Sequence, residues 1–171
     1  MPEEHISEEE SVADEQGQVA TDEWTIAALA HASVLVTLIL SMAGGVGAIV
    51  GPAIPLVMYL GYRERSRFVA FHSLQAFVYQ ITCIILYIVI SAALGGVVAI
   101  TWTVAGILSV ILIGLLMMPF AGVLTILMVV ILVGAPFAWG AYGLYGAYMV
   151  YQGSNFRYWQ IGDILEREVS G

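Results

Sequence analysis

Apolar residues fill most of the chain, and charged residues are confined to its two ends and one short stretch between them. From Phe68 to Phe156 there are 89 residues without an Asp, Glu, Lys or Arg. An uncharged apolar run longer than about 18 residues already predicts a transmembrane helix, because about 20 helical residues cross the hydrocarbon core. At ~1.5 Å per residue this run would be several times longer than the ~30 Å core. The pattern therefore predicts a chain that folds back at least twice within a membrane.

Glycines and prolines divide the apolar pattern into candidate helices. Gly95–Gly96 and Pro119 are expected to end or bend the helices beside them, because both residue types weaken a helix interior. The resulting spans are residues 24–43, 46–62 (or 52–62), 68–94 and 120–151, with a further apolar segment at 97–118.

The number of crossings has two readings. Segment length alone favours five crossings, which would put the two ends of the chain on opposite sides. Arg157 and Arg167 near the C-terminal end favour a cytoplasmic C-terminus and hence an even number. We favour the even number, with residues 97–118 re-entrant or packed into the bundle, and keep five as the alternative.

The fold class predicted is an all-α integral membrane helical bundle of about four transmembrane helices, five being the alternative. Residues 1–23 carry nine acidic side chains and no basic one, and so polar a segment buries too little apolar surface to become ordered. The predicted organisation is a disordered acidic tail at 1–22, a multi-pass transmembrane domain at 23–152 and a short polar C-terminal tail at 153–171.

One basic loop is expected to set the orientation. Arg63, Arg65 and Arg67 lie in five residues between two spans, and loops rich in Lys and Arg stay on the cytoplasmic side. One helical hairpin precedes this loop, so the N-terminus is predicted to be cytoplasmic as well. Only 11% of the residues are charged, against about 25% in soluble domains. The predicted location is a bacterial cytoplasmic membrane.

Several polar residues interrupt the apolar spans. On a helix, His72, Gln75 and Tyr79 fall within about 60° of one another, so they form one polar stripe. Lipid cannot satisfy such groups, and the stripe should therefore face the bundle interior. The candidate intramembrane polar stripe comprises His31, His72, Gln75, Tyr79 and Gln80.

The stripe has two readings. The first is hydrogen bonding between helices, worth roughly 0.6 kcal/mol per contact. The second is a polar path, or a metal or proton site, built from His31 and His72. Two histidines without a cluster of carboxylates or thiolates are a weak metal signal, and we favour the first reading. No catalytic, cofactor or metal residues are assigned.

The sequence lacks several motifs that are typical of transporters, enzymes and nucleic-acid-binding proteins. No candidate span contains an acidic or basic residue, whereas ion-coupled transporters usually keep one for the coupling ion. No G-x-S-x-G, H-E-x-x-H or P-loop motif occurs, and the chain has neither a lysine nor a basic patch for nucleic acid. We expect a small non-enzymatic membrane subunit or scaffold without a cofactor, whose partners are the lipid bilayer and either further copies of itself or other membrane proteins. The alternative is a translocon-like or channel-forming component of protein or solute transport.

Three local motifs support a family resemblance. They are LAHAS at 29–33, RERSRFVAFHSLQAFVYQ at 63–80 and YQGSNFRYWQIGD at 151–163. Together they resemble a bacterial membrane family of unknown function that is similar to the chloroplast translocon subunit Tic-twenty. The resemblance implies about four transmembrane helices with both ends on the same side, and it implies no catalytic residues. The chain departs from the plastid pattern in lacking a transit peptide and from the short bacterial members in its longer segment at 97–118.

Overall fold

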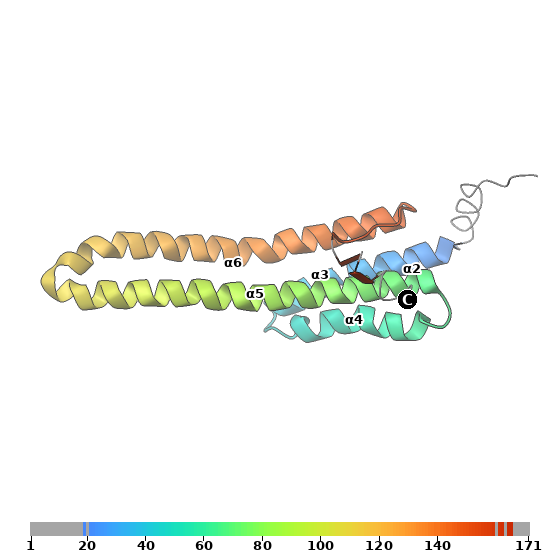
Figure 1. Cartoon of the computed structure of the whole chain (residues 1–171), viewed down its shortest axis with the longest axis horizontal. Helices are drawn as coiled ribbons and strands as arrows, with labels where there is room; N and C mark the ends of the chain where they lie inside the picture. The colour runs from blue at the N-terminus through green and yellow to red at the C-terminus, as the bar shows by residue number, and fades with distance from the viewer. Residues whose placement is uncertain (1–18, 20, 160, 163, 166–171) are drawn as a thin grey trace, which may run out of the picture.

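The computed structural model describes residues 19, 21–159, 161–162 and 164–165 of the chain. The predicted disordered tail falls almost wholly on residues outside this part. Within it the chain is helical and has no strand, which confirms the predicted all-α class (Figure 1). The elements are α2 (Thr21–Ala32), α3 (Val34–Met42), α4 (Gly47–Tyr62), α5 (Arg67–Leu108), the 3-10 helix η1 (Ser109–Ile111) and α6 (Ile113–Tyr151).

These helices form four columns that pack side by side. α2 and α3 are one column with an interruption at Ser33, and α4, α5 and α6 are the other three (Figure 1). The α2–α3 column, α5 with η1, and α6 are each long and apolar enough to cross a membrane, while α4 is shorter, with 16 residues. The predicted all-α bundle of about four helices is confirmed, and three of its four columns meet the length and apolarity of a membrane span.

One end of the bundle collects the charged residues, and we call it the charged end. Trp24 at the start of α2, Phe68 at the start of α5 and Phe156 after α6 pack against the same buried group, which includes Val150. The first helix, the α4–α5 loop and the segment after α6 thus meet at one end, as an even number of columns requires. The described charged residues there are Asp22, Glu23, Arg63, Glu64, Arg65, Arg67 and Arg157.

Local signals in the sequence explain two of the turns. Ser66 caps α5, because its hydroxyl accepts a hydrogen bond from the Val69 N–H at 3.2 Å. Between α3 and α4, Gly44 and Gly45 have φ angles of 118° and 82°, which only glycine adopts without strain.

The α5–α6 hairpin is longer than predicted. α5 has 42 residues and α6 has 39, so both run well past the α3–α4 turn (Figure 1). The prediction that α5 ends at Gly95–Gly96 is wrong, and Pro119 lies inside α6 without breaking it. Residues 97–118 are therefore not a separate element but the tip of this hairpin. In apolar surroundings a break would leave several backbone groups without partners, whereas each glycine costs only about 1 kcal/mol and a proline removes one hydrogen bond.

Candidate functional site

Buried polar side chains from three parts of the fold meet inside the bundle near its charged end. They come from the α2–α3 column, from α5 and from the segment that follows α6, and most of them are almost completely buried. We call this set the polar cluster, and its members are His31, Ser33, Thr37, His72, Gln75, Tyr79, Gln80 and Tyr158.

Two histidines and a tyrosine form a continuous hydrogen-bonded chain. His31 Nδ1 lies 3.0 Å from the Tyr158 hydroxyl, and His31 Nε2 lies 3.1 Å from His72 Nδ1. A neutral imidazole has one donor and one acceptor nitrogen. His31 can therefore donate through one ring nitrogen and accept through the other, so both hydrogen bonds can form at once. Because His31 Nε2 and His72 Nδ1 are hydrogen-bonded to each other, they do not both point at an open position where a metal ion could bind. The described residues contain no group of three or more His, Cys, Asp or Glu side chains that could hold a metal ion.

Tyr158 is the centre of the cluster, although it follows the last membrane helix. Its backbone N–H donates to Gln75 Oε1 at 2.7 Å, and its ring stacks on the Tyr79 ring at 4.0 Å between centroids. Only 2% of its surface is exposed. Burial raises the pKa of the Tyr158 phenol above its ordinary value, so the hydroxyl stays protonated and able to donate. Tyr158 therefore fixes the chain after α6 to the inside of the bundle.

Gln80 connects α3 to α5. The Thr37 hydroxyl donates to Gln80 Oε1 at 2.6 Å, and Gln80 Nε2 donates to the Ser33 hydroxyl oxygen at 2.8 Å. Ser33 in turn donates to the Ala30 carbonyl at 2.7 Å, where the column is interrupted between α2 and α3. This bonding satisfies both ends of the Gln80 amide in a place where lipid could not.

A double-mutant cycle tests the link between α3 and α5. We expect Thr37→Val and Gln80→Leu each to lower the free energy of unfolding, and the double variant to lose less than the sum. The expected coupling energy is about 0.6 kcal/mol and at most about 1.7 kcal/mol, as for other interhelical hydrogen bonds. Unfolding by a denaturing detergent, followed by circular dichroism, measures all four proteins. Strict additivity would show that the bond contributes nothing.

All five predicted stripe residues lie in the polar cluster. His31, His72 and Gln75 are 0 to 1% exposed, and Tyr79 and Gln80 are also buried. Sequence reasoning did not single out Tyr158. The signals that could have found it are two glycines: Gly153, whose φ of 81° reverses the chain after α6, and Gly146, where an added Cβ would lie 2.7 Å from the Phe156 ring.

The arginines of the predicted basic loop lie apart from the polar cluster. Arg63 and Arg65 are exposed in the α4–α5 loop, and Arg67 is exposed at the first position of α5. Arg63 forms an exposed ion pair with Glu64 at 3.5 Å, which contributes little to stability.

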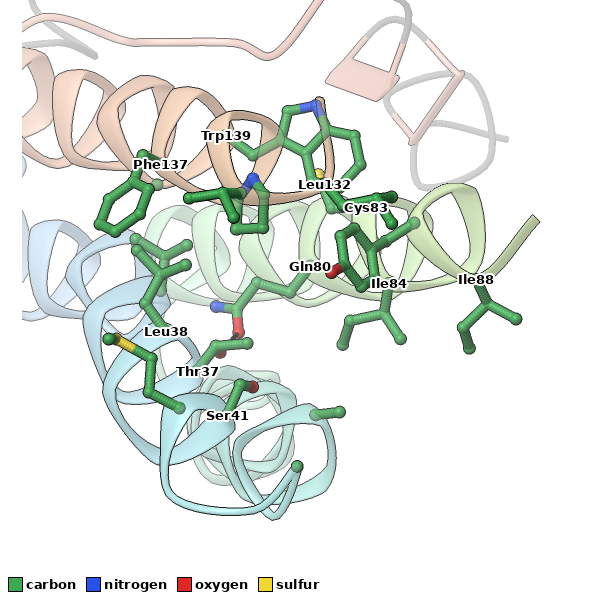
Figure 2. A pocket seen from close by; sticks show the side chains of 18 of the residues that line it. Thr37, Leu38, Ser41, Gln80, Cys83, Ile84, Ile88, Leu132, Phe137 and Trp139 are labelled. Atoms are coloured by element: carbon green, nitrogen blue, oxygen red, sulfur yellow. Dashed lines mark hydrogen bonds between the residues drawn. The ribbon is translucent and has the colours of Figure 1, made fainter. Parts of the chain in front are cut away.

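A cavity of about 500 Å³ lies beside the cluster, bounded by α3, α4, α5 and α6 (Figure 2). Thr37 and Gln80 point toward each other on one wall, and Phe137 and Trp139 of α6 lie across from them. Cys83 also lines the cavity. Its volume is in the range of small-molecule sites, but most of its lining is apolar. Such a lining suits a hydrocarbon chain better than an ion.

Comparison with known families identifies a match over most of the chain. The model of the magnetosome magnetite crystal formation protein family matches residues 22–165. No curated protein and no solved structure matches the chain. The match overturns the resemblance to the Tic-twenty-like family. A basic turn before a partly polar helix, and aromatic residues after the last span, meet general needs of a four-helix membrane bundle, so these motifs did not discriminate between the two families.

Proposed function

The chain belongs to the magnetosome magnetite crystal formation protein family, and from this premise we propose that it is a non-enzymatic subunit of the magnetosome membrane. In this proposal it contributes to magnetite crystal formation as a scaffold that packs with other membrane proteins or with further copies of itself. The observation that carries the proposal is the one-sided distribution of charge.

Away from the charged end, the bundle offers no ionic group for mineral or metal. The α3–α4 turn and the hairpin tip lie in residues 24–62 and 68–156, which contain no Asp, Glu, Lys or Arg. Carboxylates, imidazoles and thiolates are the side chains that bind transition metals. Both histidines of these segments are buried in the polar cluster, and the single cysteine, Cys83, lines the mostly apolar cavity. These features support an action through the membrane and the charged end rather than through ionic contact with the crystal.

The same charge pattern supports an orientation. Arg63, Arg65 and Arg67 favour a cytoplasmic α4–α5 loop. The start of α2 and the segment after α6 lie at the same end of the bundle, so they would also be cytoplasmic. The uncharged α3–α4 turn would then lie on the side of the membrane on which the crystal grows.

The polar cluster supports a structural role over a catalytic or conducting one. A pore needs a polar face open to water, but His72 and Gln75 have no exposed surface and Tyr158 occupies the space between them and α6. The neighbouring cavity is mostly apolar. The translocon-like alternative would require this cluster to open. Water-soluble thiol reagents that label Gln75→Cys in intact membranes would favour that alternative.

Gene deletion with complementation tests the proposed role. In a magnetosome-forming host we expect loss of the chain to change the size or shape of the crystals seen by electron microscopy. Complementation by the unchanged chain, and by a tip variant such as Val110→Ala with Ile111→Ala, should restore them. The triple change of Arg63, Arg65 and Arg67 to Ala should not, at equal amounts of protein in the membrane. Unchanged crystals after deletion would contradict the proposal. If only the tip variant failed to restore the crystals, the surface that acts in crystal formation would be the hairpin tip and not the charged end.

A further inference from the structure

The α5–α6 hairpin continues far beyond the rest of the bundle. Residues Met42 and Gly45 at the α3–α4 turn line the same cavity as Ile84 and Ile88 of α5, which places the turn at that level. Beyond Ile88, α5 runs for 20 more residues to Leu108. At ~1.5 Å per residue this is about 30 Å, the thickness of a whole hydrocarbon core.

The part of the α5–α6 hairpin beyond Ile88, which we call the distal hairpin, has an exposed apolar surface. At its tip, Val110, Leu112 and Leu116 are 86%, 70% and 82% exposed. The hydroxyl groups of residues 97–130 are occupied within the hairpin. Thr101, Thr103, Ser109 and Thr125 each donate to a carbonyl of the preceding turn, and the Trp102 indole N–H donates to Thr125. Each Å² of apolar surface left in water costs about 25 cal/mol. The distal hairpin is attached to a membrane bundle and exposes no polar side chain that needs water as a partner, so we expect it to lie in lipid.

A straight hairpin does not fit in one bilayer. α5 has 42 residues and is therefore ~63 Å long. To stay within ~30 Å of hydrocarbon it would have to tilt by about 60°, whereas transmembrane helices tilt by about 0–40°. The hairpin must therefore bend if both its parts remain in lipid.

The residues that weaken helical structure in α5 and α6 lie at the same height along the hairpin. The Trp102–Thr125 hydrogen bond and the ring contact between Tyr87 and Trp139 set which residues face each other. By this register Ser91 stands opposite Pro136, and Gly95–Gly96 stand about three residues from Gly134. A Cβ added at any of these three glycines would meet nothing within 4 Å, so these positions face away from the neighbouring helix and offer no steric resistance to bending.

Backbone and side-chain groups at this level also lack partners. Pro136 has no N–H, and the Leu132 carbonyl one turn earlier therefore has no donor in the helix. The Ser91 hydroxyl is buried and has no hydrogen-bond partner among the described residues. Prolines and glycines are the usual positions of sharp helix bends, and here they occur in both helices of one hairpin.

We infer that in a bilayer the α5–α6 hairpin bends at residues 91–96 and 131–136, and that residues 97–130 turn back into the hydrocarbon as a re-entrant hairpin. Its partner is lipid on the side away from the charged end. From Gly96 to Leu108 there are only 12 residues, ~18 Å, which is too short to cross ~30 Å. The tip thus ends inside the hydrocarbon and adds no further crossing. The inference needs only insertion in a membrane and is independent of the role in crystal formation.

Tryptophan quenching tests where the distal hairpin lies. In full-length protein with Trp24, Trp139 and Trp159 changed to Phe, the remaining Trp102 reports on residues 97–130. In vesicles we expect acyl-chain-brominated lipids to remove most of its emission and aqueous iodide to remove almost none. A variant that keeps only Trp159, which is 82% exposed at the charged end, should respond to iodide and serves as the control. Iodide quenching of Trp102, or protection from both quenchers, would overturn the inference, because the hairpin would then lie in water or be covered by protein.

A distance measurement tests the bend itself. Spin labels at Glu64→Cys and Val110→Cys, in a Cys83→Ser background, should be roughly 65 Å apart if α5 stays straight and less than about 50 Å apart if it bends. The expected result in vesicles, with the labelled chain diluted in unlabelled protein, is the shorter distance. Changing Gly95, Gly96 and Pro136 to Ala should shift the distribution toward the longer one. A distance of ~65 Å in vesicles would overturn the bend even if Trp102 is quenched by lipid.

Discussion

Changing Tyr158 to alanine is expected to lower the free energy of unfolding by about 3–5 kcal/mol, the usual cost of removing a large buried aromatic side chain. The substitution removes the ring that stacks on Tyr79 and the hydroxyl that pairs with His31. It also frees the segment after α6 from the bundle. Unfolding in mixed detergent micelles, followed by circular dichroism, gives the free energy. Trypsin cleavage after Arg157 gives a separate measure of whether the segment is released.

Tyr158→Phe is the matched control for this experiment. It keeps the ring and its packing but removes the hydroxyl, so His31 Nδ1 loses its partner. The expected loss is about 1 kcal/mol, as for one buried hydrogen bond, with little change in cleavage. If the alanine variant were as stable as the phenylalanine variant, the segment after α6 would not be anchored by this side chain.

Changing Gly51 to valine is expected to cost about 3 kcal/mol or more, at or above the upper end for overpacking. A Cβ at Gly51 would overlap the Thr37 side chain and come within 2.7 Å of the Thr37 Cα. Backbone cannot rotate away as a flexible side chain can, so α3 and α4 would have to separate. Small residues allow such close helix contacts in membranes. Detergent unfolding measures the loss in free energy, and a crosslink between cysteines on α3 and α4 reports the separation.

Gly61→Val provides the comparison in the same helix. Nothing lies within 4 Å of a Cβ added there, and the residue change is the same, so both variants share the effect of valine on helix propensity. We expect Gly61→Val to change stability by less than about 1 kcal/mol. Equal losses at the two glycines would mean that the α3–α4 contact is not a tight one.

The fold was predictable because length and polarity dominate in membranes. Charge-free runs predicted the helical class, and Arg157 and Arg167, considered with the basic loop, predicted the even number of columns. The helix ends were not predictable in the same way. Gly95–Gly96 and Pro119 would end helices in a soluble protein, but in lipid each break leaves backbone groups without hydrogen bonds. The continuous α5 therefore contradicts a rule that holds mainly in water.

The candidate site was predictable only in part. His72, Gln75 and Tyr79 share a helix face, and helical periodicity is enough to group them. Tyr158 is 83 residues from Gln75 in sequence, and their contact depends on a chain reversal after α6. Tertiary contacts of that kind are not visible in periodicity. The family was missed for another reason, since the quoted motifs reflect membrane insertion rather than one lineage.

The concentration of charge at one end has a consequence for biosynthesis. On insertion scales, a charged residue at the centre of a helix costs about 2.5–3.5 kcal/mol. The leading turns of the two helical hairpins, residues 43–46 and 109–112, contain no charged residue. Both hairpins can therefore enter the bilayer from the side on which the charged end remains, without carrying a single ionised side chain through it. The partitioning of apolar segments alone would drive this assembly, and no polar loop would have to be translocated.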